Sequence, residues 1–135
     1  MKKFLALFLM IILTASCSLD DGTNFHFAAM PITGVEVPES FEQGETYEIK
    51  VKYMRPTNCY FFEGFDYRIG TDNTRTVVVI NTVLDDNTCE ELEDEEVEVS
   101  FDFIVLDTKT YTFRFWQGYD DNGQSEFLTV EVPVE

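Results

Sequence analysis

Apolar and polar residues alternate along most of the chain from position 32 onward. The clearest case is the segment 46–53, in which every second residue is apolar. Successive side chains of a β-strand point to opposite faces, so a period of two predicts a strand with one buried face. The same period recurs in three later segments, 97–105, 111–115 and 128–134. The pattern therefore predicts at least four half-buried strands.

Three further segments have the composition of strands. The segments 60–67 and 75–84 are rich in aromatic and β-branched residues, and the short segment 32–37 ends before Pro38. Clusters of Gly, Pro, Asn and Asp separate these segments, as turns do. About seven short strands in one domain, 32–135, predict a sandwich of two antiparallel sheets.

The predicted layout resembles that of immunoglobulin-like domains. The most similar part is the turn Gly44-Glu45-Thr46-Tyr47, which leads into the second strand. The resemblance implies an all-β fold, namely a single immunoglobulin-like antiparallel β-sandwich of about seven strands. A likeness of this kind concerns architecture and implies no function.

The first 16 residues have the pattern of a secretory signal peptide. Lys2 and Lys3 precede an unbroken apolar run, 4–13, and three small residues, 14–16. An apolar run of this length is too short to remain as a membrane-spanning helix. We therefore expect the leader to be removed on export.

The end of the leader also indicates how the protein is anchored. The segment 13–17, Leu-Thr-Ala-Ser-Cys, resembles the lipobox of bacterial lipoproteins. The resemblance implies a signal peptide of residues 1–16, cleavage before Cys17 and lipidation of the Cys17 sulfur. Two acyl chains together make a stable membrane anchor. The alternative is an ordinary signal peptide that is cut near Ala15 and leaves Cys17 unmodified.

Residues 17–31 are predicted to form a lipidated, acidic tether, because no periodicity persists there. Its start, Ser18-Leu19-Asp20-Asp21-Gly22, resembles the acidic export signal of surface lipoproteins of the Bacteroidetes. The resemblance implies a lipid-anchored protein of the outer membrane, exposed at the cell surface. The alternatives are the periplasmic face of that membrane and a solvated linker that carries no signal.

The chain is strongly acidic, with 26 Asp and Glu against 9 Lys and Arg and a net charge of −17. The net charge becomes −19 if Lys2 and Lys3 leave with the leader. So few cations cannot neutralise a nucleic-acid backbone, and an anionic bilayer would repel the domain. We therefore exclude nucleic acid as a partner and expect membrane attachment only through the lipid at Cys17.

The three cysteines divide into one anchor and one pair. Acylation of Cys17 would leave Cys59 and Cys89 together in an oxidising compartment. Both lie where strands are predicted to begin or end, and we predict a disulfide between them. A zinc site is not expected, because the chain has no Cys-X2-Cys motif and no histidine near these cysteines.

Catalysis is not expected of this chain. The only histidine, His26, falls in the predicted tether, so no nucleophile and histidine base can be paired within the rigid domain. Pairs of carboxylates are too abundant here to indicate a glycosidase. We predict a protein that is not an enzyme and needs no cofactor.

Two acidic segments, 85–96 and 120–126, could offer oxygen ligands to calcium. Neither has the alternating spacing and glycine turn of a twelve-residue calcium loop. We favour solvated, mutually repelling loops without a metal. The segment 85–96 also lacks an apolar stripe and is predicted as a loop rather than a helix.

The last hairpin carries the candidate binding residues. If Phe115 points inward, Arg114 and Trp116 point outward, and a loop from 118 to 125 places Phe127 opposite Trp116 and beside Tyr119. Exposed aromatic clusters serve as anchors for protein partners and as stacking surfaces for sugars. The alternative is that the acidic loop or the segment 25–27 covers Trp116.

These patterns predict a cell-envelope lipoprotein that acts as a non-catalytic binding or structural module. Its ligand would be a protein or a glycan, whereas a spacer would need none. The alternative is a chagasin-like cysteine-protease inhibitor, because the segments 55–60 and 114–116 are similar to the Asn-Pro-Thr-Thr-Gly-Tyr and Arg-Pro-Trp loops of those inhibitors. The Thr-Thr-Gly centre and the proline of those loops are missing here.

Overall fold

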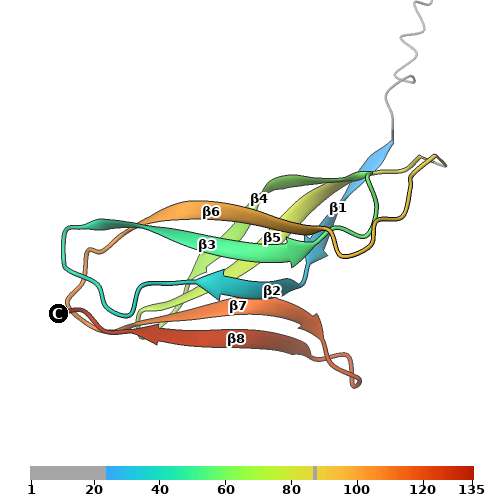
Figure 1. Cartoon of the computed structure of the whole chain (residues 1–135). Helices are drawn as coiled ribbons and strands as arrows, with labels where there is room; N and C mark the ends of the chain where they lie inside the picture. The colour runs from blue at the N-terminus through green and yellow to red at the C-terminus, as the bar shows by residue number, and fades with distance from the viewer. Residues whose placement is uncertain (1–23, 87) are drawn as a thin grey trace, which may run out of the picture.

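The computed structural model describes residues 24–86 and 88–135, and this part of the chain contains strands and no helix (Figure 1). The strands are β1 (Phe25–Met30), β2 (Ile32–Glu36), β3 (Thr46–Met54), β4 (Tyr60–Ile69), β5 (Thr74–Leu84), β6 (Glu96–Ile104), β7 (Tyr111–Tyr119) and β8 (Ser125–Val132). The prediction of an all-β fold is confirmed. The number of strands is eight rather than about seven, because β1 was not predicted.

The strands form two sheets that face each other as a sandwich. The larger sheet contains β4, β5, β7 and β8 together with β1, and the smaller sheet has the order β2-β3-β6. Strands β1 and β7 share one edge of β5: β7 pairs with residues 74–77 and β1 with residues 79–84. Strand β4 pairs along the other edge of β5.

One strand pairing corrects the prediction of purely antiparallel sheets. Strands β5 and β7 run parallel, with Thr74 opposite Thr112 and Val77 opposite Phe115. The chain crosses to the smaller sheet as β6 before it returns as β7, and such a crossover allows two neighbouring strands to run in the same direction. The larger sheet is therefore mixed.

The finer prediction of an immunoglobulin-like topology is not confirmed. Both sheets of an immunoglobulin domain are antiparallel, whereas here β5 and β7 are neighbours that run parallel. One feature of such sandwiches is nevertheless present, because the Tyr111 hydroxyl accepts hydrogen bonds from the backbone nitrogens of Leu106 and Asp107, at 3.2 and 2.9 Å. The structure establishes a β-sandwich and no closer relationship.

The core lies between the sheets and is built from the alternating inward positions. Ile49, Val51 and Tyr53 of β3 are buried, as the period of two predicted. Phe113 and Phe115 of β7 face them from the larger sheet and are fully buried. Each such side chain contributes about 1.5–3 kcal/mol by leaving water, so these aromatic residues hold the two sheets together.

Strand β1 corrects the predicted boundary between tether and domain. The predicted tether, 17–31, includes Phe25–Met30, which pairs with residues 79–84 of β5 and ends on the buried side chain of Met30. Pro31 follows, and it has no backbone N–H to donate to a strand ladder, so β1 ends before it. The chain then passes from the larger to the smaller sheet. The domain therefore includes residues before position 32.

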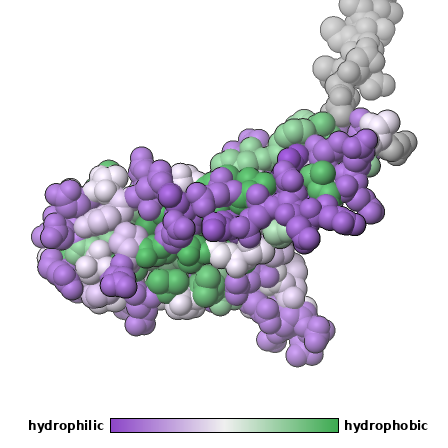
Figure 2. Space-filling view, viewed as in Figure 1, coloured by the Kyte–Doolittle hydropathy of each residue, from purple (hydrophilic) through white to green (hydrophobic). Residues whose placement is uncertain are grey.

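The predicted signal peptide, 1–16, and Cys17 lie outside the described residues. Among the residues that are described, no helix is long and apolar enough to cross a membrane. On the face that Figure 2 presents, hydrophilic side chains predominate and apolar ones gather in patches between them.

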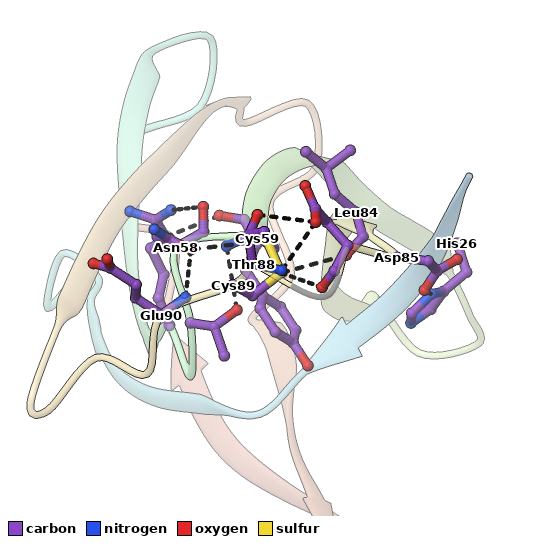
Figure 3. The surroundings of a disulfide bond; sticks show 12 residues. His26, Asn58, Cys59, Leu84, Asp85, Thr88, Cys89 and Glu90 are labelled. Atoms are coloured by element: carbon purple, nitrogen blue, oxygen red, sulfur yellow. Dashed lines mark hydrogen bonds and ion pairs between the residues drawn. A yellow bond between two sulfur atoms is a disulfide. The ribbon is translucent and has the colours of Figure 1, made fainter. Parts of the chain in front are cut away.

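The predicted disulfide between Cys59 and Cys89 is present, with 5.6 Å between the two Cα atoms (Figure 3). It joins the β3–β4 connection to the acidic loop that follows β5. Backbone hydrogen bonds run beside it, from the Asn58 nitrogen to the Glu90 oxygen at 3.0 Å and from the Leu84 nitrogen to the Cys59 oxygen at 3.0 Å. The described residues of 85–95 form a loop, as predicted, and Glu96 begins β6.

Candidate functional site

The candidate binding residues lie on the outer face of the larger sheet. Trp116 of β7 stands opposite Phe127 of β8, as the predicted hairpin register requires. The register shifts immediately afterward, so that Tyr119 stands opposite Ser125. Gly118 lies in this irregularity with a φ of 99°, a conformation that strongly favours glycine. The shift turns the end of the hairpin and brings Tyr119 beside Trp116.

The predicted accessibility of Trp116 is wrong, because its side chain is only 8% exposed. Its indole nitrogen donates a hydrogen bond to the Ser125 hydroxyl at 3.1 Å, and its ring meets Tyr119 edge to face at a centroid distance of 5.2 Å. Trp116 does point outward, as predicted, since it lies outside the core cluster between the sheets. Residues of its own hairpin, and not the acidic loop or the segment 25–27, make these contacts.

A surface pocket of about 360 Å³ lies beside this aromatic group. Trp116, Tyr119 and Phe127 line one part of it, and Asp66 and Arg68 of β4 line another. Tyr119 is 69% exposed and presents most of its ring to solvent. The pocket thus combines a fixed aromatic wall with a pair of charged side chains.

Asp66 and Arg68 form a two-point ion pair at the rim of the pocket. The Arg68 Nε and Nη2 atoms donate to the two carboxylate oxygens of Asp66 at 3.1 and 3.0 Å. Hydrogen bonding to Asp66, together with its charge, raises the pKa of Arg68 above its ordinary value. The Arg68 side chain is 75% exposed, so the pair adds little to stability and stays accessible to a ligand.

Arg114 is the fourth candidate residue, and it contacts the ring of Phe127, which lines the pocket. Its guanidinium carbon lies 3.9 Å from the centre of the Phe127 ring, within the range of a cation–π contact. Arg114 does not line the pocket itself. Its contact fixes the orientation of the Phe127 ring.

Other strands bring to the pocket residues that the sequence pattern did not predict as site residues. Asp66 and Arg68 come from β4, and Thr76 and Val78 come from β5. Alternation within each strand places these positions outward, because Val77 and Val79 between and beside them are buried in the core. Alternation does not predict the order of strands in a sheet. The pocket could not be predicted from it, because the pocket forms only where β5 lies next to β7.

The two acidic segments proposed as alternatives for calcium show no metal-ligating cluster within the described residues. In the segment 120–126, one carboxylate oxygen of Asp120 accepts hydrogen bonds from the backbone nitrogens of Asn122 and Gln124, at 2.8 and 2.9 Å. This carboxylate therefore caps the turn of the hairpin. His26, which was expected in the tether, lies in β1, where its Nδ1 atom is 2.8 Å from an Asp85 carboxylate oxygen.

The two segments that are similar to inhibitor loops occupy different surroundings. The segment 114–116 lies within strand β7, where Phe115 is fully buried. The segment 55–60 forms the connection next to the disulfide and enters β4 at Tyr60. No observation on the described residues favours the inhibitor alternative.

Comparisons with known proteins identify no relative of this chain. No family model, no curated protein and no solved structure matches the chain. Function is therefore argued from the residues of the site and from the leader alone.

Proposed function

We propose that the protein is a lipid-anchored protein of the cell envelope that displays a non-catalytic, ligand-binding β-sandwich at the cell surface. The leader and the segment 13–17 support the anchoring part of the proposal through their resemblance to lipoprotein signals. The acidic residues that follow Cys17 support display at the surface. The binding part rests on the geometry of the described domain.

The pocket on the outer face of the larger sheet carries the binding part of the proposal. Trp116 is held rigidly by Ser125 and Tyr119, so its ring loses no further freedom when a ligand arrives. Tyr119 offers an accessible ring, and Asp66 with Arg68 offers hydrogen-bond acceptors and donors a short distance away. This arrangement favours a ligand with both an apolar face and peripheral hydroxyl groups.

A glycan is the ligand class that fits these groups best. One face of a sugar ring is apolar and stacks on an aromatic side chain, while its hydroxyl groups bond to charged side chains at the edge. The pocket volume of about 360 Å³ is in the range of ligand-binding sites. A protein that inserts a single side chain would use the same groups and is the second outcome of the test.

Binding of the full chain to a glycan array tests this proposal. We expect selective binding that falls at least tenfold in Tyr119→Ala and in Arg68→Gln, because these variants remove the accessible ring and the hydrogen-bond donors. Leu106→Ala is the matched control, since Leu106 is 77% exposed and lies outside the pocket. Its binding should equal that of the unmodified chain.

Three results would overturn the glycan assignment or the whole site. Binding that is unchanged in Tyr119→Ala and Arg68→Gln would move the ligand elsewhere on the domain. Capture of a protein and of no glycan, lost in the same two variants, would replace the ligand class. Failure to bind any glycan or envelope protein would leave a spacer as the function of the domain.

A further inference from the structure

Two edge strands of the sandwich, β4 and β6, lie next to each other without pairing. Within the described residues, β4 pairs only with β5 and β6 pairs only with β3, and both run along the same side of the molecule (Figure 1). A groove of about 460 Å³ lies between them. This groove is separate from the Trp116 pocket, because the inner faces of the strands line it.

The walls of the groove are mostly apolar, and Asp102 of β6 is the one carboxylate among the residues that line it. Tyr67 and Ile69 of β4, Phe101 of β6 and Leu106 just beyond β6 are among the residues that line it. Ile69 and Leu106 are 71% and 77% exposed. Large apolar side chains that converge on a concave surface indicate a site for an apolar group.

Arg75 is the one cation in the groove. It shares the inward side of β5 with Val77 and Val79, and its guanidinium carbon lies 5.2 Å from the centre of the Tyr111 ring. One of its nitrogens, Nη1, donates to the Thr74 carbonyl oxygen at 3.2 Å. Arg75 thus enters the space between the sheets rather than the surrounding water.

The guanidinium of Arg75 has no carboxylate partner among the described residues. None of the ion pairs found there includes Arg75, although the chain has 26 Asp and Glu. Its Nε atom is buried and has no hydrogen-bond partner. The hydrogen-bonding capacity of this guanidinium is therefore not fully used by the described residues, which favours an acceptor that enters the groove.

Tyr67 provides a second donor next to Arg75. Burial raises the pKa of the Tyr67 hydroxyl, while the charge of Arg75 and a hydrogen bond with it act in the opposite direction. Because the net shift is upward from 10.0, Tyr67 carries its proton at neutral pH and can donate it in a hydrogen bond.

We propose that this groove binds a small amphipathic monocarboxylate of the fatty-acid class, with its carboxylate on Arg75 and its hydrocarbon chain on the apolar walls. A planar carboxylate matches the fork of a guanidinium, and a single negative charge is all that one arginine neutralises. A more highly charged headgroup would meet the strong negative charge of the domain without a second cation. The groove volume also falls within the range of small-ligand sites.

Calorimetry with decanoate tests the proposal. The full chain carrying Cys17→Ser keeps the anchor's own acyl groups out of the assay. We expect saturable binding of one decanoate per chain, well below the concentration at which decanoate forms micelles. The uncharged 1-decanol should bind at least tenfold more weakly, because it has the same chain but cannot pair with Arg75.

Variants connect the binding to the groove. Arg75→Gln should weaken decanoate binding at least tenfold, whereas Arg68→Gln removes an arginine on the outer face and should leave it unchanged. Leu106→Glu places a negative charge at an exposed position of the groove and should also weaken binding. Because Leu106 is exposed, this variant keeps the test valid if Arg75→Gln fails to fold, which near-ultraviolet circular dichroism would reveal.

Several results would overturn the proposal. These are the absence of saturable binding, equal binding of decanoate and 1-decanol, and equal losses in Arg75→Gln and Arg68→Gln. Binding of an extended peptide to the edge of β6, with no binding of decanoate, would assign the groove to a different partner. Glycan binding depends on Tyr119 and not on Arg75, so the two sites succeed or fail independently.

Discussion

The indole nitrogen of Trp116 donates a hydrogen bond to the hydroxyl of Ser125, 3.1 Å away on the neighbouring strand. This bond joins the two strands of the last hairpin just where their register shifts. The single tryptophan of the chain therefore points away from the core and yet is covered by its own hairpin. Although most of its surface is covered, Trp116 forms part of the pocket wall and packs against Tyr119.

Trp116→Ala should consequently destabilise the domain. Removal of a large buried aromatic side chain costs about 3–5 kcal/mol in a core, and we expect the lower end of that range on this outer face. Urea unfolding measures the loss. Tyr119→Ala is the control and should cost less than about 1 kcal/mol, because Tyr119 is mostly exposed. Tryptophan emission that iodide quenches as freely in the folded as in the unfolded chain would contradict the burial.

The disulfide should be a major source of stability. Cys59 and Cys89 are 30 residues apart, and a cross-link over a loop of that length restricts the unfolded chain by roughly 3–4 kcal/mol. Reduction should lower the unfolding temperature but leave the sandwich folded, since the bond lies at one end and not in the core. Peptide mapping without reductant checks the pairing in the exported protein, where two free thiols would refute it.

The strands and the buried faces of this domain were predictable because they depend on local pattern. Alternation placed Ile49, Val51 and Phe115 inward, and all three are fully buried. Strand β1 was missed because its sequence, Phe-His-Phe-Ala-Ala-Met, continues into apolar residues without a polar alternation. Its extended form is set by pairing with β5, from Phe25 with Leu84 to Met30 with Val79, far along the chain.

The candidate site was only partly predictable for a similar reason. The hairpin partners Trp116 and Phe127 follow from a turn of short range. Asp66 and Arg68 lie in β4, which pairs with β5. They line the same pocket as Trp116 only because β5 in turn pairs in parallel with β7. A parallel pairing between distant segments leaves no local signal in the sequence. The burial of one side chain by its neighbours, as of Trp116, leaves none either.

Alkaline pH should destabilise the domain through Tyr53 and Tyr67. Burial is the main cause that raises the pKa of each hydroxyl above 10.0 in the folded state. An acid whose pKa is higher when folded contributes stability below its unfolded pKa, and that contribution is lost as the pH rises through the folded value. The free energy of unfolding should therefore fall above about pH 10, as urea titrations between pH 8 and 12 can measure. Tyr53→Phe should flatten this dependence, and an unchanged slope would count against the assignment.

Membrane attachment should depend on Cys17. In Cys17→Ala the protein should leave the membrane fraction, because two acyl chains are the proposed anchor and the acidic domain is repelled by anionic lipid. Fractionation followed by a high-salt wash measures the distribution. Ser16→Ala, which keeps the cysteine, is the matched control and should remain with the membrane. Retention of Cys17→Ala in the membrane fraction after the wash would refute the proposal that a lipid on Cys17 anchors the protein.

Tyr111 should anchor the connection between the two sheets through its hydroxyl. This oxygen accepts hydrogen bonds from the backbone nitrogens of Leu106 and Asp107, so Tyr111→Phe leaves two donors without their acceptor in a part-buried position. A donor left unpaired costs about 1–3 kcal/mol, and we expect a total loss in that range because water reaches part of the turn. The same change at Tyr47, whose hydroxyl accepts one bond from Glu42 at 2.9 Å, is the matched control and should cost less. Urea unfolding of the two variants side by side decides the matter, since equal losses would mean that the hydroxyl of Tyr111 has no special role at the corner.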